Sequence, residues 1–566
     1  MKLKKIFLFA SMLIMLSACK KFDDNLNGLL SDPSQPTPAS ADVDLYLNNL
    51  QLSFQSFYQQ ASDLTDPLVR METMFGQLYY STYSPASYDG IWNTAYTSVF
   101  KTANIMIPLA EEKSEFIHSG IAKVLKAYTM ITMVDLFGDI PYSEANQGVA
   151  NTNPKVDGGA AVYDSALVIL DDAIATFAKT SLKDPSDDIF YGGDATKWTT
   201  FAKTLKLKAY IQTRLVDNTV AANISSLLSD GDLITSASQD FVFNFSSHNP
   251  APDSRASHYV SNYGTDVGTA DYLGNYFMWC LDQEKGMVDP RIRYYIYRQI
   301  DDIALGTYDY SDPRLADQTT TQFALACYYR TPPGQYTPGT PYCLIGEGYW
   351  GRDHGNNEGT GPDALLKSTW GLYPVGGAFD ANQNDQVGPS HEAGAKGDGI
   401  NPIWLSSYTY FVEAEAALTL GTTGDPEALL VQGVNASFNK VAGFANSIGY
   451  TLPTTDTSLL ITAYKQDQYV KKVKALYEAA STPAAKLNVI MKEYYLAAWG
   501  NGVEPYNNYR RTSSPNNMQP SVNPDPGTFI NSFFYASVYA DYNKSAVQKT
   551  TVGVKVFWDN NPDDLK

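Results

Sequence analysis

The sequence predicts a mostly α-helical protein that is interrupted by one long, loop-rich and aromatic region. Apolar side chains recur at the spacing of a helix face in several stretches of both halves of the chain. Between about residues 236 and 401, in contrast, Gly, Pro, Asn and Tyr are frequent and no periodicity persists. Because this region is too long for a plain loop, we expect it to have irregular structure of its own.

The first eighteen residues have the pattern of a bacterial export signal. Three lysines within the first five residues precede an apolar stretch, residues 6–16, that is too short to span a bilayer. The next residues, Leu16-Ser17-Ala18-Cys19, match the lipobox of bacterial lipoproteins. We therefore expect cleavage before Cys19 and acylation of its thiol, which makes Cys19 a lipid anchor and leaves it no role as a catalytic nucleophile.

Residues 19–41 are expected to form a flexible tether. They are rich in Asn, Ser, Pro and Gly and cannot bury enough apolar area to fold. Asp23 and Asp24, close behind the cysteine, resemble a surface-export signal of bacterial lipoproteins. No later run of eighteen apolar residues follows, so we expect nothing else to span a membrane and the body, residues 42–566, to be held by its lipid anchor.

The charge of the chain excludes one class of partner. The formal net charge is −19, and removal of the first eighteen residues, which contain three lysines and no acidic residue, changes it to −22. A strongly negative body repels nucleic acid and anionic lipid, so we expect no nucleic-acid partner.

Helices are predicted on both sides of the loop-rich region. In the N-terminal scaffold, about residues 42–235, amphipathic stripes cover residues 121–134, 163–177 and 198–209. The first stripe stops at Phe137-Gly138-Asp139-Ile140-Pro141, where Gly and then Pro terminate a helix. In the C-terminal scaffold, about residues 402–515, the stripes cover residues 408–418, 429–441 and 487–498. Large aromatic residues on or beside helices are expected in the core, namely Trp92, Trp198, Trp404 and Trp499.

The cysteines of the body allow two interpretations. Cys280, Cys327 and Cys343 cannot all pair within one chain. A bridge between Cys327 and Cys343 would close a short Pro-, Gly- and Tyr-rich loop, and free buried thiols are the alternative.

Five segments, in order, resemble the SusD/RagB family. Residues 122–145 (AKVLKAYTMITMVDLFGDIPYSEA) resemble its hallmark helix and turn, and residues 188–215 (DIFYGGDATKWTTFAKTLKLKAYIQTRL) resemble its GGD…W…LK helix. Asp289-Pro290-Arg291 is similar to its DPR element, and residues 408–421 (YTYFVEAEAALTLG) to its late AEA helix. Residues 494–515 (YYLAAWGNGVEPYNNYRRTSSP) resemble its G…E…RRT segment. Lys208, where the family often has Arg, and Pro505, where it often has Trp, indicate a divergent branch.

The resemblance implies a fold and a role. The fold would be a mostly α-helical SusD-like domain of tetratricopeptide-like helix pairs, each pair burying one apolar face. The protein would bind oligosaccharides or peptides at the cell surface and pass them to a SusC-like TonB-dependent outer-membrane transporter, without catalysis. The lipid anchor would attach it to the membrane.

Two aromatic segments are the candidate ligand-binding residues. Sugars are bound by flat aromatic faces with polar side chains at the rim, and Gly allows close backbone approach. Both segments provide this combination, and a packed core or a surface that faces the transporter is the alternative for them. The candidates are Tyr79, Tyr80, Tyr83 and Tyr88 in the first segment, and Trp350, Arg352, Asp353, His354, Asn356, Trp370 and Tyr373 in the second.

Other chemistry is weakly supported. Asp380, Asn382 and Asn384 stand at alternate positions, as at the start of a calcium-binding loop. The Gly and Glu of the later EF-hand positions are missing, so a calcium site of another kind is only a loose alternative. No other cofactor is expected. The G-x-G-x-x-G match at residues 346–351 runs into a segment that cannot open a helix, which argues against a nucleotide site. The few histidines lack zinc-ligand spacing, so no metal site is expected.

Two other functional classes remain as alternatives. A lipid-anchored glycoside hydrolase or peptidase would need a pair of catalytic groups, and no acidic pair stands out. Glu413 and Glu415 lie two residues apart on one predicted helix and so on different faces of it. The other charged pair near this end of the chain, Arg510 and Arg511, is expected to form structural ion pairs. A surface protein without a small ligand is the third possibility.

Overall fold

The computed structural model is mostly helical, which confirms the predicted fold class. It describes residues 42–263, 271–298, 331–342, 345–346, 348–356, 367–382, 390 and 392–562. The predicted signal, Cys19 and the tether lie outside the described residues, as do Cys327 and Cys343. Cys280 is a free and buried thiol.

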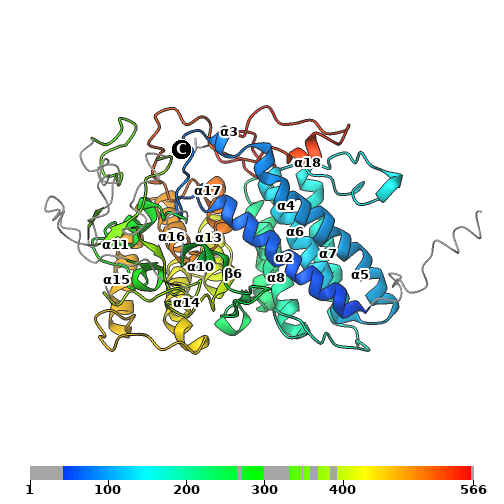
Figure 1. The fold of residues 1–566 in the computed structure, drawn as a ribbon, viewed down its shortest axis with the longest axis horizontal. Helices are drawn as coiled ribbons and strands as arrows, with labels where there is room; N and C mark the ends of the chain where they lie inside the picture. Colours follow the sequence, from blue (N-terminus) through cyan, green and yellow to red (C-terminus); the bar gives the residue numbers. More distant parts are fainter. Residues whose placement is uncertain are drawn as a thin grey trace, which may run out of the picture.

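The N-terminal part of the chain forms a group of packed helices that lies on the right in Figure 1. The hallmark helix α6 packs against α7, and α7 packs against α8, so that successive helices bury one face against the next. The elements of this part are α2 (Val43–Thr65), α3 (Tyr79–Thr82), η2 (Pro85–Tyr88), α4 (Asp89–Asn93), η3 (Thr94–Phe100), α5 (Lys101–Glu112), α6 (Phe116–Phe137), η4 (Gly148–Ala150), α7 (Gly159–Phe177), α8 (Ala195–Gln212) and α9 (Val220–Asp230).

Local sequence signals set the ends of these helices. The Asp42 side chain accepts the Asp44 amide before α2, and the Asp194 side chain accepts two amides before α8, which satisfies donors that the first turn leaves free. Helix α6 ends at Gly138, whose φ of 72° and ψ of −122° disfavour any residue with a side chain. The helix stop predicted at this point is confirmed.

The middle of the chain carries short helices and short strands. Among the described residues, two antiparallel pairs join segments that are far apart in sequence, β1 with β6 and β2 with β5, and β3 pairs locally with β4. The elements are η5 (Ala237–Gln239), β1 (Phe241–Asn244), α10 (Ser257–Asn262), α11 (Asn275–Asp282), α12 (Ile292–Tyr295), β2 (Ile296–Tyr297), β3 (Ile345–Gly346), β4 (Tyr349–Trp350), β5 (Thr369–Trp370) and β6 (Ile400–Trp404). Arg352 to Asn356, after the G-x-G-x-x-G match, open no helix.

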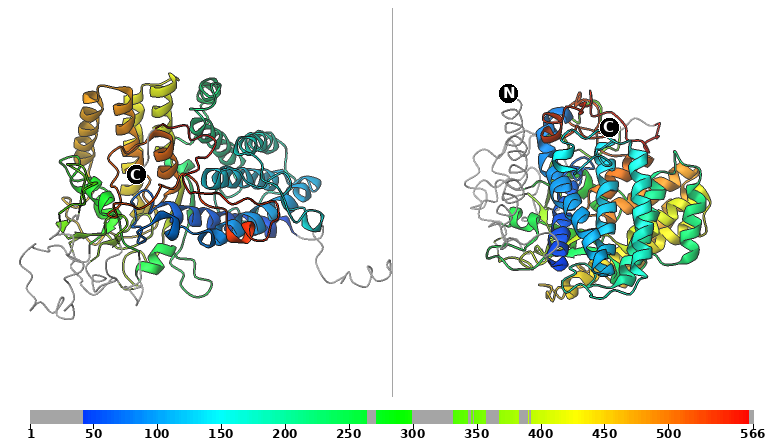
Figure 2. Two further views of the ribbon diagram at one scale, coloured as in Figure 1. Left: turned by 90° about the horizontal axis from the view of Figure 1, so that it is seen from above. Right: turned by 90° about the vertical axis from the view of Figure 1, so that its right-hand side faces the viewer.

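The C-terminal part returns to long helices. Figure 2 (left) shows α13 to α16, in yellow and orange, side by side on the half of the molecule away from the cyan helices. Helix α13 packs against α14 and α16, and α17 lies against α16 and reaches α2. The elements are α13 (Ser406–Leu420), α14 (Pro426–Ser447), α15 (Ala463–Ala479), α16 (Pro483–Ala497), α17 (Val503–Thr512) and α18 (Ser537–Ala540).

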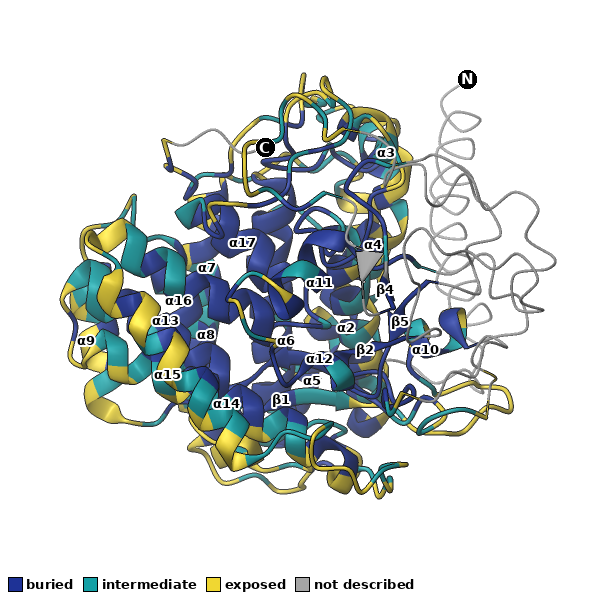
Figure 3. Ribbon diagram, turned by 90° about the vertical axis from the view of Figure 1, so that its left-hand side faces the viewer, coloured by how far each residue is buried: buried dark blue, intermediate teal, exposed yellow. Residues whose placement is uncertain are grey.

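One hydrophobic core runs through both helical parts, from Val43 to Trp558. In Figure 3 the buried residues fill the centre, while α9, α14 and α15 turn exposed faces outward. The aromatic residues expected in the core, Trp92, Trp198, Trp404 and Trp499, are all buried, which confirms the prediction for them.

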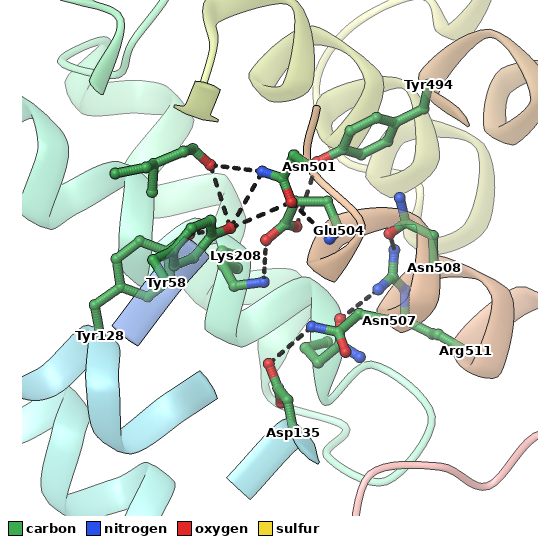
Figure 4. A network of polar contacts seen from close by, with 12 residues as sticks. Tyr58, Tyr128, Asp135, Lys208, Tyr494, Asn501, Glu504, Asn507, Asn508 and Arg511 are labelled. Carbon is green, nitrogen blue, oxygen red and sulfur yellow. Dashed lines mark hydrogen bonds and ion pairs between the residues drawn. The ribbon is translucent and has the colours of Figure 1, made fainter. Parts of the chain in front are cut away.

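The family-like segments meet in a buried polar network, drawn in Figure 4. Lys208 Nζ of α8 lies 2.6 Å from Glu504 Oε1 of α17, and both side chains are almost fully buried. Asn507 donates to Asp135 of α6 at 2.8 Å. Arg511 pairs with the buried Glu415 of α13 at 2.6 Å, which confirms a structural role for this arginine.

Candidate functional site

Most of the aromatic residues predicted to bind a ligand are core residues in the structure. Tyr79, Tyr83, Tyr88, Trp370 and Tyr373 are at most 5 % exposed. Tyr88 stacks on Phe533 at 4.7 Å, and Trp370 stacks on Trp499 at 4.0 Å. Since a buried ring has no free face for a sugar, these residues correspond to the packed core that was the alternative for the two aromatic segments. The physical reason is that side chains from distant parts of the chain pack on these rings: Phe533 stacks on Tyr83 and Tyr88, and Trp499 stacks on Trp370.

The polar candidates of the second segment are also held internally. Asp353 accepts the Gln519 amide at 2.6 Å, and His354 lies 2.9 Å from the Tyr79 hydroxyl. Burial, together with the nearby Arg70, lowers the pKa of His354 well below its ordinary value, so this ring is neutral. Asn356 is half-buried. The side chain of Trp350 lies outside the described part of the chain, and Tyr80 is the one aromatic candidate of the first segment with a largely exposed ring, at 58 %.

The loose calcium alternative is not supported by the residues that the structure describes. Arg298 Nε lies 2.6 Å from Asp380 Oδ2, and Arg293 NH1 lies 2.7 Å from Asn382 Oδ1. The two guanidinium groups occupy the oxygen atoms that would have to hold a cation, and a third positive charge there would be repelled. Asn384 lies outside the described residues.

A pocket of about 320 Å³ lies where α2, the turn after it and α10 meet. Its volume falls in the usual range for small-ligand sites. Its walls combine carboxylates, hydroxyls and two aromatic rings: Asp63, Pro67, Glu72, Thr73, Phe75, Ser257, His258, Ser261, Asp271 and Tyr272. We take this pocket as the candidate binding site and call it the α2/α10 pocket.

Backbone pairing brings the walls of the α2/α10 pocket together. The Thr73 amide donates to Tyr272 O at 2.8 Å, and the Gly274 amide donates to Met71 O at 2.9 Å. At Gly274 the chains approach so closely that a Cβ atom would lie 2.1 Å from Arg70 O. Arg352, one of the predicted residues, pairs with Leu273 through its amide at 3.0 Å. The second predicted segment therefore pairs with the backbone next to Tyr272, which lines the pocket.

Aromatic and cationic groups form one wall of the pocket. The Phe75 and Tyr272 rings meet edge to face at 5.4 Å, and Phe75 remains 38 % exposed. The Arg352 guanidinium lies 4.4 Å from the centre of the Tyr272 ring, and Lys367 Nζ lies 4.5 Å from it. The same guanidinium lies 5.7 Å from the centre of the Phe75 ring, and Phe75 is the more exposed of the two rings and so the one that can contact a ligand.

His258 is the positive centre of the pocket. Its Nδ1 lies 3.0 Å from Asp271 Oδ2, and its Nε2 lies 3.3 Å from Asp63 Oδ1. The ring stacks on Trp370 at 4.3 Å, and the indole Nε1 of Trp370 donates to Glu72 Oε1 at 3.0 Å. Burial alone would lower the pKa of His258, but Glu72, Asp271 and Asp63 raise it well above its ordinary value. The ring is therefore a cation at neutral pH.

The acidic side chains around His258 differ in protonation. Burial raises the pKa of Glu72 well above its ordinary value and that of Asp66 to about 8. For Asp271 the bond from His258 outweighs burial and lowers the pKa. Two sets of side chains are close enough to share a metal ion, Asp63 with Asp66 and His258, and Glu72 with His258 and Asp271. Carboxylates contact both ring nitrogens, so the imidazolium offsets part of the negative charge of this cluster.

Most of the lining of this pocket has no signal in the sequence. Asp63 and His258 are separated by nearly two hundred positions and become neighbours only when α10 packs over the end of α2. No local spacing marks either residue. Phe75 lies just before the predicted tyrosine-rich segment, so an extension of that segment by a few residues would have included it.

Two family models cover most of the chain. A model described as "Starch-binding associating with outer membrane" matches residues 35–332, more than half of the chain. A second, "Susd and RagB outer membrane lipoprotein", matches residues 382–555. The chain belongs to the SusD/RagB family. The family predicted from the sequence is thereby confirmed, and a comparison with curated protein sequences found no match.

Solved SusD/RagB structures share the fold across nearly the whole chain. A family member from Bacteroides thetaiotaomicron is 19 % identical, with a TM-score of 0.65, and the alignment covers 93 % of this chain and 100 % of that one. A SusD homologue from Bacteroides fragilis is 15 % identical, with a TM-score of 0.63 and coverage of 92 % and 99 %. A chitin-binding SusD homologue from Flavobacterium johnsoniae is 17 % identical, with a TM-score of 0.60 and coverage of 91 % and 99 %.

Among the residues that the structure describes, none of the helices is both long and apolar enough to cross a membrane.

Proposed function

We propose that this SusD/RagB protein is a lipid-anchored outer-membrane protein that binds neutral oligosaccharides in the α2/α10 pocket. The observation that carries the proposal is the combination of an exposed Phe75 ring with carboxylate and hydroxyl groups around one small pocket. Phe75 can pack on the C–H face of a pyranose, while Asp63, Ser257 and Ser261 can bond its hydroxyls. The starch- and chitin-binding descriptions of the matched family and of one structural relative favour sugars over peptides.

The charge of the pocket supports an uncharged ligand. The carboxylates of Asp63 and Asp271 pair with the imidazolium of His258. Among the described residues that line the pocket, this leaves polar groups and no unpaired cation. A polyanionic ligand would meet carboxylates at the pocket mouth and would be disfavoured.

Delivery and anchoring complete the proposal. Cys19 would carry the lipid, residues 19–41 would form the tether, and the body, residues 42–566, would pass the ligand to a SusC-like TonB-dependent transporter. No catalytic step is proposed. Asp63 and Asp271 pair with His258, and Glu72, whose pKa is raised by burial, accepts a hydrogen bond from the Trp370 indole, so the pocket does not offer the two free carboxyl groups that a glycosidase uses. Turnover of oligosaccharides or peptides by the pure protein would favour a lipid-anchored hydrolase instead.

Calorimetry with maltoheptaose and chitohexaose tests the proposal. Phe75→Ala should weaken binding of the preferred oligosaccharide about tenfold or more, because stacking on the ring is lost. Tyr80→Ala is the matched control, since Tyr80 is an exposed aromatic residue that does not line the α2/α10 pocket. If Tyr80→Ala alone weakens binding, the site lies at the sequence-predicted tyrosines and this pocket is not the site.

A further inference from the structure

A second cavity, of about 310 Å³, is formed by other elements than the α2/α10 pocket. It is bounded by the beginning of α5, the middle of α6 and the turn that follows α6, on the side of the molecule where these two helices pack together (Figure 1). Lys126, Asn104, Tyr142, Asn146 and Gln147 contribute to its lining. The cavity is thus rich in amide groups and contains one ammonium group.

Lys126 enters this cavity without an acidic partner. Its Nζ donates to Asn104 Oδ1 at 2.8 Å and lies 5.6 Å from the centre of the Tyr142 ring. No ion pair of Lys126 exists among the residues that the structure describes. Lys123, less than one turn earlier on α6, shows the usual arrangement, with Glu111 at 2.5 Å and Asp172 at 2.6 Å. Two of the three donors of the Lys126 ammonium are therefore available.

The acidic side chains of the adjoining turn are held by other donors. Asp157 Oδ2 accepts the Tyr142 amide at 2.8 Å and the Ser143 amide at 2.9 Å. Glu144 Oε2 accepts Asn151 Nδ2 and the Lys155 amide, both at 3.1 Å. Neither carboxylate serves as a counter-ion for Lys126.

Partial desolvation makes this ammonium a stronger anion ligand. Burial lowers the pKa of Lys126, which shows that its charge is costly where it stands. An anion that enters the cavity would offset that cost, and a charge-assisted hydrogen bond in such a site is stronger than one in water.

We propose that this cavity is a second ligand site, which binds the carboxylate of an acidic sugar of the hexuronate class through Lys126. The carboxylate would accept from the two remaining Nζ donors, the half-buried Tyr142 ring would contact the sugar body, and Asn104, Asn146 and Gln147 would bond hydroxyls. The inference does not depend on the neutral-sugar site, because the two pockets share no residue.

A titration with galacturonic acid and its neutral counterpart galactose, followed by ligand-observed NMR on the full mature chain, tests the proposal. The wild-type protein should bind galacturonic acid at least tenfold more tightly than galactose. Lys126→Met keeps the aliphatic stem and should abolish this preference. Lys101→Met, which removes an exposed charge next to the cavity on α5, should retain it. Both variants should bind neutral oligosaccharide in the α2/α10 pocket as the wild type does.

Equal binding of the two sugars, or an unchanged preference in Lys126→Met, would overturn the proposal. Tighter binding of the dipeptide Gly-Gly than of galacturonic acid would overturn the sugar class.

A second measurement needs only the wild-type protein and so does not depend on the folding of a variant. Because the carboxylate raises the pKa of Lys126, galacturonic acid should cause proton uptake at alkaline pH, seen as a calorimetric enthalpy that depends on the buffer. Absence of uptake would contradict a contact with Lys126.

Discussion

At the scale of single residues, the buried charges of this protein are paired across helices. Lys208 and Glu504 are 2 % and 4 % exposed and join α8 to α17 at 2.6 Å. Glu504 also accepts from the Tyr494 hydroxyl at 3.4 Å. A buried pair of this kind contributes little compared with apolar packing, but the loss of one partner leaves the other charged and desolvated.

Lys208→Met should therefore destabilise the protein by about 3 to 5 kcal/mol. The measurement is the free energy of unfolding in urea. Lys471→Met removes one partner of the exposed pair Lys471–Asp467, whose side chains are 64 % and 53 % exposed, and should change stability by less than about 1 kcal/mol. Similar effects of the two substitutions would show that the buried pair has no special role.

His258 makes stability depend on pH in a defined direction. Its folded pKa lies well above its ordinary value, so folding takes up a proton between about pH 6.5 and the folded pKa. The contribution of His258 is fully present below about pH 6.5 and is lost as the pH rises through the folded pKa. The raised pKa values of Glu72 and Asp66 act in the same direction.

We expect NMR to show the His258 ring protonated at pH 7.5, with its resonance assigned by loss of the signal in His258→Gln. The unfolding free energy of the wild type should fall as the pH rises above about 6.5, and His258→Gln should reduce this slope. A ring that loses its proton near pH 6.5 would contradict the cluster described for the pocket.

At the scale of elements, helices with wide apolar faces were predictable and sparsely buried ones were not. The stripe at residues 121–134 predicts α6 because nearly every residue of that helix is buried. Helix α15 buries only Tyr469, Val473 and Tyr477, so its apolar pattern is faint in the sequence. Helix α2 was not predicted either, although it buries Val43, Leu47, Leu50, Phe54 and Phe57 at helical spacing, because the Gln, Asn and Ser residues between them make its apolar pattern less evident.

The end of α6 gives a test at this scale. Gly138→Ala places a Cβ atom at φ 72° and ψ −122° and should cost about 1 to 3 kcal/mol, measured by thermal unfolding. The same substitution at Gly443, an exposed position inside α14 with open space for a Cβ atom, should stabilise the protein by about 0.5 to 1 kcal/mol. Loss of stability at both positions, or at neither, would contradict this account of the helix end.

At the scale of the whole molecule, the family was predictable because its sequence motifs are structural. Asp135, Lys208, Glu504 and Arg511 come from three helices and lie in the buried network of Figure 4, and Arg511 also pairs with the buried Glu415 of a fourth helix. Such residues indicate the fold. The candidate ligand site, in contrast, is formed by residues from distant parts of the chain that share no sequence motif. Five of the predicted aromatic residues, Tyr79, Tyr83, Tyr88, Trp370 and Tyr373, are buried and Tyr80 is exposed, a difference that the sequence does not reveal because composition gives the number of rings and not their burial.

The predicted anchor gives a test of membrane attachment. Cys19→Ala removes the acylation site and should move the protein from the membrane fraction to the soluble fraction of fractionated cells. Cys280→Ala, which alters a buried free thiol of the body, is the matched control and should leave the protein in the membrane fraction. Retention of the Cys19→Ala protein in the outer membrane would contradict lipid anchoring.

The most direct test of the account is a crystal structure of the protein with the neutral oligosaccharide that binds most tightly. We predict sugar density in the α2/α10 pocket, with a pyranose ring against Phe75 and a hydroxyl bonded to Asp63. Density at any other place on the protein, with this pocket empty, would contradict the account.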